Sequence, residues 1–163
     1  MIRLAQKYDV SSILRVMDAA RGIMRADGNL TQWANGYPAE QDILADIEQK
    51  IGYVLEKDGE IGAYFALMPS PEPAYNKIYD GEWLDDTLPY HVVHRLGSYP
   101  HVRGVFRSML AFSFSADKNI RIDTHRDNRI MQHNLCINGF TYCGIIHLLS
   151  GDERLAYQKI MEA

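Results

Sequence analysis

The stretch IRIDTHRDNRIMQHNLCINGF, residues 120–140, carries the clearest structural signal in the chain. Residues Asn119–Thr124 alternate in the way of a strand with one buried face. We predict a helix over Asn128–Asn138, closed by Gly139, the residue type best suited to a left-handed helix C-terminus. The stretch therefore predicts a strand, a short turn and a helix, in that order.

Apolar spacing and turn residues outside this stretch predict the remaining elements. The Asp-Gly turn at residues 57–60 joins two strands as a hairpin. Apolar residues at helical spacing predict a first helix, capped by Asp9 or Ser11, and a second with Pro38 in its first turn. The predicted strands are 2–5, 52–56, 61–68, 89–98, 119–124, 140–149 and 154–160, and the predicted helices lie between Asp9 and Gly28 and at 38–50, 102–116 and 128–138.

The resulting element order is β-α-α-β-β-β-α-β-α-β-β, with a long loop at residues 69–88 (PSPEPAYNKIYDGEWLDDTL). Strands and helices alternate over residues 89–149, which predicts an α/β (α+β) fold with a mixed sheet and crossover helices. No GxGxxG follows a strand, which argues against a Rossmann fold. Because the sequence has no internal repeat and no linker, we expect one domain over residues 1–163.

Composition and charge limit the classes of function. The chain has 47% hydrophobic and 23% charged residues, as globular proteins do. Its net charge of −4 argues against non-specific nucleic-acid binding, and no apolar run reaches the roughly 18 residues of a membrane span. The first residues lack the apolar run of a signal peptide, and Cys136 and Cys143 fit neither a redox nor a zinc motif. We therefore expect a cytoplasmic protein.

Two blocks of sequence resemble the GCN5-related N-acetyltransferase (GNAT) family. The first is HRLGSYPHVRGVF, residues 94–106. Members of the family have a strand like L-A-V, a loop (Q/R)-x-x-G-x-(G/A) and then a helix. Leu96-Gly97-Ser98 stands at the strand motif, and His101-x-x-Gly104-x-Phe106 stands at the loop motif. His101 and Phe106 depart from the family pattern.

The second block is the stretch quoted first, and it is closer to the family. Asn128 and Gly139-Phe140 have the family spacing N-x(10)-G-F. Many members carry a tyrosine seven residues after that asparagine, where this chain has Leu135. The two blocks together, in the family's order and spacing, identify the chain as similar to the GNAT acetyltransferases over nearly its whole length.

The resemblance implies a mostly antiparallel sheet with a central splayed pair of parallel strands and flanking helices. It implies an N-acetyltransferase that moves an acetyl group from acetyl-coenzyme A to a primary amine by direct transfer in a ternary complex, without a metal. It also implies that a backbone N–H near Leu96 or Gly97 binds the carbonyl oxygen. The coenzyme contacts that it implies are Leu96, Gly97, Ser98, Val102, Arg103, Gly104, Val105, Phe106, Arg107 and Asn128.

The loop before the helix at residues 102–116 also suits phosphate on physical grounds. Its unpaired N–H groups and positive dipole end attract an anion, and Gly104 has no Cβ to hold a phosphate away. Arg103 and Arg107 add charge-assisted donors. The alternative interpretation of Gly104 is a plain turn glycine before a helix.

The chemistry requires a base, because an alkylammonium is only about a thousandth deprotonated at pH 7. His94 is our candidate, since strand alternation puts it on the same face as Leu96 and some amine acetyltransferases of the family have a histidine there. His94 as a packed or solvated strand residue is the alternative. Carboxylates of the acidic loop, Glu82, Asp85 or Asp86, are other candidates for the base. With Leu135 at the usual tyrosine position, the sequence predicts no general acid.

The acceptor site is expected in the variable segments. Trp33, Tyr37, Tyr75 and Trp83, with Tyr79, would wall a pocket for a small-molecule or peptide amine, and the acidic residues of the long loop would favour a cation. The alternative is that these aromatic side chains close a small core under the loop.

Two other functions stay open from the sequence. One is a coenzyme-binding sensor or assembly module without catalysis, and the other is an acyltransferase of this fold with another acyl donor or acceptor. We expect no metal, because His91, His94, His101, His125 and His133 lack the spacing of zinc ligands. Nucleic acid and membrane are not expected partners, and the protein is expected to be a monomer or a homodimer.

Overall fold

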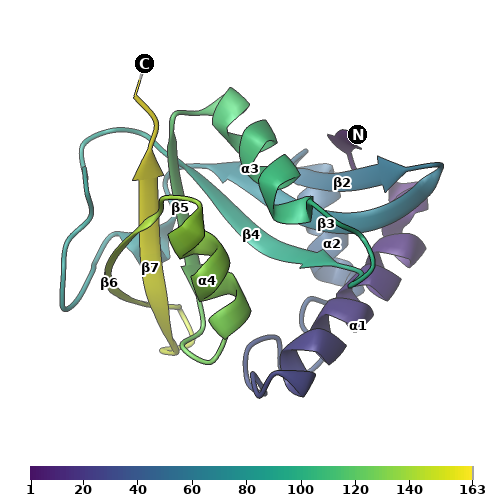
Figure 1. Cartoon of the computed structure of the whole chain (residues 1–163), viewed down its shortest axis with the longest axis horizontal. Helices are drawn as coiled ribbons and strands as arrows, with labels where there is room; N and C mark the ends of the chain where they lie inside the picture. The colour runs from purple at the N-terminus through teal and green to yellow at the C-terminus, as the bar shows by residue number, and fades with distance from the viewer. Residues whose placement is uncertain (163) are drawn as a thin grey trace. The chain divides into compact units, whose positions relative to one another are not determined.

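The computed structural model describes residues 1–162 (Figure 1). It has the predicted element order, with two short 3₁₀ helices added. The strands form a seven-stranded, mostly antiparallel sheet in the order β1-β2-β3-β4-β5-β7-β6, with β4 and β5 parallel and helices flanking the sheet. The elements are β1 Ile2–Leu4, η1 Lys7–Asp9, α1 Val10–Ala26, α2 Glu40–Glu48, β2 Gly52–Lys57, β3 Glu60–Pro69, η2 Pro73–Tyr75, β4 His91–Ser98, α3 Val105–Ala116, β5 Asn119–Thr124, α4 Arg129–Ile137, β6 Thr141–His147 and β7 Glu153–Ile160.

Two predictions about the starts of helices differ from the structure. Asp9 stands at the N-cap position of α1, but its carboxylate accepts hydrogen bonds from Gln6 N and the Arg3 guanidinium instead of the helix. Pro38 lies outside α2, whose N-cap is Ala39. The Asp9 carboxylate is used by contacts outside α1. Ala39 occupies the N-cap position of α2, so Pro38 lies just before that helix.

The chain divides into two compact units. Unit 1 comprises residues 1–67 and 94–112, and unit 2 comprises residues 68–93 and the residues from Ser113 onward. Unit 1 contains β1, β2, nearly all of β3 and the second half of β4, together with α1, α2 and most of α3. The prediction of a single domain over residues 1–163 stays a prediction.

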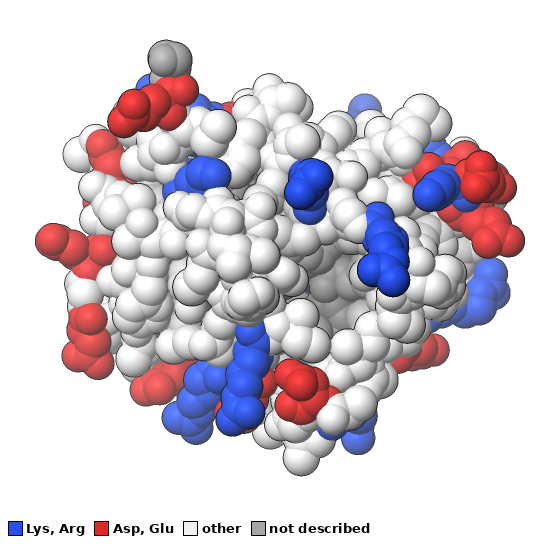
Figure 2. All heavy atoms as spheres, viewed as in Figure 1, with Lys and Arg blue, Asp and Glu red and all other residues white. Residues whose placement is uncertain are grey.

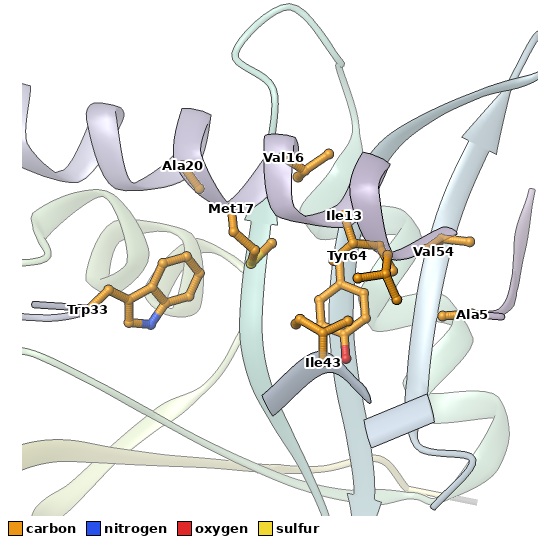
Figure 3. Packing of buried hydrophobic residues seen from close by; sticks show 10 residues of the cluster. Ala5, Ile13, Val16, Met17, Ala20, Trp33, Ile43, Val54 and Tyr64 are labelled. Atoms are coloured by element: carbon orange, nitrogen blue, oxygen red, sulfur yellow. The ribbon is translucent and has the colours of Figure 1, made fainter. Parts of the chain in front are cut away.

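Both faces of the β2–β3 hairpin in unit 1 are covered. Val54 pairs with Tyr64, and the next residue pair points to the opposite face, as the two-residue period of strands requires. Val54 and Tyr64 pack against Ile13 of α1 and Ile43 of α2, and Figure 3 shows these apolar side chains turned toward one another. On the other face, Leu55 and Ala63 pack with Val105 of α3.

Unit 2 is built on β5 and β7. The antiparallel partner of β5 is β7, which pairs in turn with β6, and His91 and Val92 of β4 pair in parallel with Ile120 and Arg121 of β5. The core of unit 2 comprises Tyr75, Trp83, Tyr90, Val92, Cys143, Ile146 and Ala156. Two of these aromatic residues come from the segment 69–88, so this loop is part of the core.

A buried arginine attaches the loop to β5. Arg121 is 1% exposed, and its guanidinium carbon lies 3.9 Å from the Trp83 ring centre and 4.0 Å from that of Tyr90. Its Nη2 donates to Asp85 O at 3.0 Å and to Asp86 Oδ1 at 3.2 Å. A cation desolvated between two aromatic rings gains strongly from both, so the loop is held in one conformation.

Candidate functional site in the first unit

Strand β4 is irregular where the predicted base lies. Arg95 has φ of 54°, in the left-handed region that non-glycine residues rarely occupy. Strict alternation therefore does not continue through Arg95, and the argument that related His94 to Leu96 by alternation does not apply. Leu96 packs with Leu55 and Val105, on the face of β2 and β3 opposite to α1.

The side chain of Arg95 reaches a buried carboxylate on α2. Its Nη1 lies 3.1 Å from Asp46 Oδ1 and 3.3 Å from Oδ2, and Asp46 is 3% exposed. The Tyr64 hydroxyl donates to Asp46 Oδ2 at 2.5 Å. Gly52 makes room for this contact, because a Cβ there would lie 2.8 Å from Tyr64 Oη. The carboxylate thus receives hydrogen bonds from two strands.

Burial and pairing shift the titration of this cluster. Burial raises the pKa of Asp46 above its ordinary value, against the Tyr64 hydrogen bond and the positive charge of Arg95, which lower it. A positive charge on the His94 imidazole would lower the pKa of Asp46, so the imidazole lies within electrostatic range of the carboxylate. Burial and the Asp46 charge raise the pKa of Tyr64, which keeps its hydroxyl protonated as a donor.

Two predicted acceptor residues lie beside the same part of β4. A Cβ added to Gly97 would meet Met17 Cε at 2.7 Å and the Trp33 ring at 3.4 Å. Figure 3 shows Trp33 next to Met17 and Ala20 of α1. Tyr37, which is 38% exposed, has its ring centre 5.7 Å from the Arg95 guanidinium carbon. Trp33 is buried in the core of unit 1, whereas Tyr37 stands at its surface.

The segment after β4 is anchored to β3. Tyr99 N donates to Gly62 O at 3.1 Å, and Val102 packs so closely on Gly62 that a Cβ there would lie 2.8 Å from it. Gly104 has φ of 73° with open space around its missing Cβ, and α3 begins at the next residue. Arg103 and Arg107 are exposed, Val105 is buried, and Ser98 and Phe106 are half-buried. The predicted coenzyme loop therefore has its Cβ-free residue and both of its arginines at the surface.

Asn128 and Leu135, the remaining residues of the family motif, lie in unit 2. Asn128 caps α4, since its Oδ1 accepts from Met131 N at 3.0 Å. This is the capping role that asparagine commonly takes, and a coenzyme contact for Asn128 stays a prediction. Leu135 is fully buried. The side chain at the position of the family's tyrosine thus points into a core.

Tyr75 and Trp83 lie in the core of unit 2, as the alternative interpretation of the loop describes. Tyr75 is 1% and Trp83 6% exposed. The Tyr75 hydroxyl donates to Asp123 Oδ2 at 2.6 Å, and Trp83 Nε1 donates to Tyr75 O at 3.1 Å. Among the predicted acceptor residues of this loop, Tyr79 is the more exposed, and its ring stacks on His147 at 4.6 Å. A role of Tyr75 and Trp83 in acceptor binding stays a prediction.

The acidic loop uses three of its carboxylates within unit 2, and one of them is Asp86, which accepts from Arg121 Nη2. Asp85 accepts hydrogen bonds from Thr87 and from Leu88 N, and these hold its pKa below the ordinary value. Glu72 accepts from Ala74 N at the start of η2. Glu82 is exposed. The contacts that the structure shows for Asp85 and Glu72 are thus those of local turns.

Three further observations on residues 1–162 concern metal binding, membrane-spanning helices and surface charge. No group of three or more His, Cys, Asp or Glu side chains in that range is placed to hold a metal ion. No helix in the same range is long and apolar enough to cross a membrane. On the face shown in Figure 2, Lys and Arg side chains are spread among uncharged and acidic residues, and some lie next to one another near the lower left edge of the view.

In unit 1, Tyr37 and His94 thus lie near a cluster that the sequence did not single out, and Gly97 lies next to Trp33. That cluster is Asp46, Tyr64 and Arg95. Asp46 had one usable signal, because it lies three residues after Ile43 and beside Ile47, on the apolar stripe of its helix. A carboxylate on a core-facing stripe requires a partner, but the sequence does not tell which one.

Comparison with known proteins agrees with this architecture. No model of a protein family and no curated protein sequence matches the chain. A solved acetyltransferase of the GNAT family from Streptococcus agalactiae has 35% sequence identity and a TM-score of 0.91, over 100% of this chain and 96% of that chain. A GNAT-family acetyltransferase from Listeria monocytogenes has 19% identity and a TM-score of 0.71, over 99% and 94%.

A ribosomal-protein-alanine N-acetyltransferase from Brucella melitensis has 17% identity and a TM-score of 0.64, over 99% of both chains. The second and third similarities concern the fold alone. The first similarity, with 35% identity over 100% of this chain and 96% of that chain, also shows the family. This chain belongs to the GNAT family of acetyltransferases.

Proposed function

We propose that the protein transfers an acetyl group from acetyl-coenzyme A to a primary amine, directly and in a ternary complex. The observation that carries the proposal is the arrangement on β4, in a chain of the GNAT family. There, His94 precedes the irregular residue Arg95, and the backbone of Leu96 and Gly97 follows it.

The acyl donor would bind at the segment that leads into α3. Helix N-termini present unpaired N–H groups and a positive dipole end, and α3 begins directly after Gly104. Arg103 and Arg107 are exposed on this segment, so their guanidinium groups are available to the phosphates of the acyl donor. Val102 holds the segment on β3 through its contact with Gly62, which keeps the loop in place before the donor arrives.

His94 would act as the base, directly or through a water molecule. It takes the proton from the ammonium group of the acceptor, and the amine nitrogen then forms a bond to the acetyl carbon. The carbonyl oxygen, which gains negative charge, accepts a hydrogen bond from the backbone N–H near Leu96 or Gly97. The carbon–sulfur bond breaks, the newly bonded nitrogen loses its second proton to water, and the coenzyme thiolate takes a proton from water, so the products are the amide, the free thiol and the proton held by His94. No general acid is assigned, because Leu135, at the position of the family's tyrosine, has no proton to donate.

The acceptor would be a small-molecule or peptide amine that approaches past Tyr37, the more exposed of the predicted aromatic residues of unit 1. We propose a cytoplasmic protein without nucleic-acid or membrane partners, acting as a monomer or homodimer. Its two cysteines are free thiols, with Cys136 exposed, and such thiols are typical of a reducing compartment.

Two measurements test the function. Calorimetric titration with acetyl-coenzyme A measures donor binding, and release of the free thiol against a panel of primary amines measures transfer. The proposal requires binding and amine-dependent release. Binding without release for any amine or acyl donor would instead identify a coenzyme-binding module, the alternative that the buried Leu135 favours. Release only with another acyl donor, or with hydroxyl acceptors, would identify a different acyltransferase.

A further inference from the structure

We propose that Asp46 and Arg95 are positioning residues for the acetyl transfer. They hold β4 in its irregular conformation, and thereby place the His94 imidazole and the N–H groups of Leu96 and Gly97. This inference rests on the proposed function, which assigns those groups their roles.

The irregular conformation of Arg95 needs an external restraint. A left-handed φ of 54° is unfavourable for a residue with a Cβ, and such a conformation persists only where the surroundings impose it. Residue 95 is not a glycine, so the residue type itself does not favour this conformation. The restraint that the structure shows is the side chain, which extends from β4 to α2 and meets the Asp46 carboxylate at 3.1 and 3.3 Å.

Asp46 is itself held firmly. Its carboxylate is buried and accepts the Tyr64 hydroxyl at 2.5 Å, and Tyr64 is 0% exposed. A guanidinium bound to a carboxylate inside a protein interacts more strongly than in water, because the surrounding dielectric is low. Through Asp46, the Arg95 side chain is therefore fixed to both α2 and β3.

The strand is held again two residues later. The backbone of Gly97 lies against α1, since a Cβ there would come within 2.9 Å of Ala20 Cβ. The residues from Arg95 to Gly97 are thus fixed at both ends, by an ion pair at one end and by close packing at the other. Leu96, between these two points, carries the N–H group that the proposed function uses.

The same carboxylate is in electrostatic range of His94, the residue before Arg95. Removal of its charge would therefore change both the backbone conformation after His94 and the field at the imidazole. Asp46 would not touch the substrate. It would act through Arg95 and His94.

The experiment compares two buried aspartates of unit 1. Asp46→Asn keeps an oxygen for the Tyr64 hydroxyl but removes the charge that holds Arg95. The matched control is Asp9→Asn, because Asp9 is 4% exposed and pairs with Arg3 at 2.8 Å, at the start of α1. We expect Asp46→Asn to lower kcat by at least about tenfold at an unchanged Kd for acetyl-coenzyme A, as misplaced reacting groups do. We expect Asp9→Asn to keep the wild-type kcat.

Arg95→Gly is the second variant, and it covers the case in which Asp46→Asn does not fold. Glycine adopts the left-handed conformation without strain. The backbone of this variant can therefore still take its native conformation, but no side chain holds it there. We expect its kcat to fall by about as much as that of Asp46→Asn, again roughly tenfold or more. Wild-type kcat in a folded Arg95→Gly variant would overturn the proposal.

Amide hydrogen exchange gives a readout that needs no acceptor. We expect the Leu96 and Gly97 amides to exchange at least about tenfold faster in Asp46→Asn and Arg95→Gly than in the wild type, and at the wild-type rate in Asp9→Asn. Unchanged exchange in both test variants would refute the positioning role. If exchange changes as expected but the wild type transfers no acyl group, then the proposed function fails and the restraint on β4 stands.

Discussion

Gly97 of β4 and Met17 of α1 lie so close that a Cβ added to Gly97 would stand 2.7 Å from Met17 Cε. Ala20 Cβ would be 2.9 Å away and the Trp33 ring 3.4 Å. The Met17 side chain can move aside, but Ala20 Cβ is fixed to the backbone of α1 and moves only if the helix moves. We predict that Gly97→Ala destabilises the protein by about 1–3 kcal/mol through overpacking. Thermal unfolding measures the change.

Gly22→Ala is the control for this prediction. Gly22 lies within α1, and nothing lies within 4 Å of the position of its Cβ. Alanine there should stabilise the helix by about 0.5–1 kcal/mol. Equal Tm values for Gly97→Ala and the wild type would mean that α1 can move away from β4 at little cost.

Gly104→Val tests where the coenzyme binds. The Cβ would enter open space, so the loss of folding stability should come only from the left-handed φ of 73° and amount to about 1–2 kcal/mol. A branched side chain facing the phosphates should weaken acetyl-coenzyme A binding by more than about tenfold, as loss of charge-assisted hydrogen bonds does. Calorimetry measures the Kd.

Gly59→Val is the matched control, because Gly59 has φ of 80° and open space in the β2–β3 turn. It should cost similar stability and leave the Kd unchanged. A folded Gly104→Val variant with wild-type affinity would move the phosphate site elsewhere.

His94→Gln tests the base. We predict that kcat falls by roughly 10²-fold, the usual contribution of a general base, while the Kd for the donor stays the same. Only an unprotonated imidazole accepts a proton, so the loss of kcat/KM that the wild type shows on acidification should be absent in the variant. His133→Ala, on the exposed side of α4, is the control. If Glu82→Gln or Asp86→Asn abolishes turnover and His94→Gln does not, the base is a carboxylate of the loop.

Trp83→Ala distinguishes core packing from acceptor binding. Trp83 is 6% exposed and covers the Arg121 guanidinium, so truncation should cost about 3–5 kcal/mol of stability. Leu84→Ala, at a neighbouring side chain that is 50% exposed, should change stability by no more than about 0.5 kcal/mol. A small change in Tm together with a raised KM for the amine would show that Trp83 lines the acceptor pocket.

Asp9 predicts a pH dependence of stability. Its hydrogen bonds with Arg3 hold its pKa below the ordinary value of 3.8, although burial opposes this shift. The carboxylate therefore stabilises the fold above pH 3.8, and this contribution is lost as the pH falls through the lower folded-state pKa. The difference in Tm between the wild type and Asp9→Asn should be constant near neutral pH and shrink in acid.

Asp46 should show the opposite trend. Burial raises its pKa, so the folded state takes up its proton at a higher pH than the unfolded chain does. The wild type should therefore gain stability relative to Asp46→Asn as the pH falls toward 3.8. If the difference in Tm from the wild type changed with pH in the same direction for both variants, the opposite pKa shifts of Asp9 and Asp46 would be contradicted.

The order of helices and strands was predictable because its causes are local. Residues 119–124 form β5 with the predicted bounds, and α4 starts one residue after Asn128, which caps it. Strand and helix periods and turn residues depend on neighbours a few positions apart, and the printed sequence shows these directly. The family motifs are local in the same sense, and the 35% identical relative confirms the family and the fold that they implied.

The sequence by itself therefore determined the element order, the mixed sheet and the family, whereas His94 as the base stays a prediction. Only the tertiary structure decided that Arg95 meets Asp46, 49 residues away, and that Arg121 lies between Trp83 and Tyr90. Each of these charges had several possible partners in the sequence. The choice depends on which segments folding brings together, and on the cost of leaving a buried charge unpaired, and neither is set by the neighbouring residues.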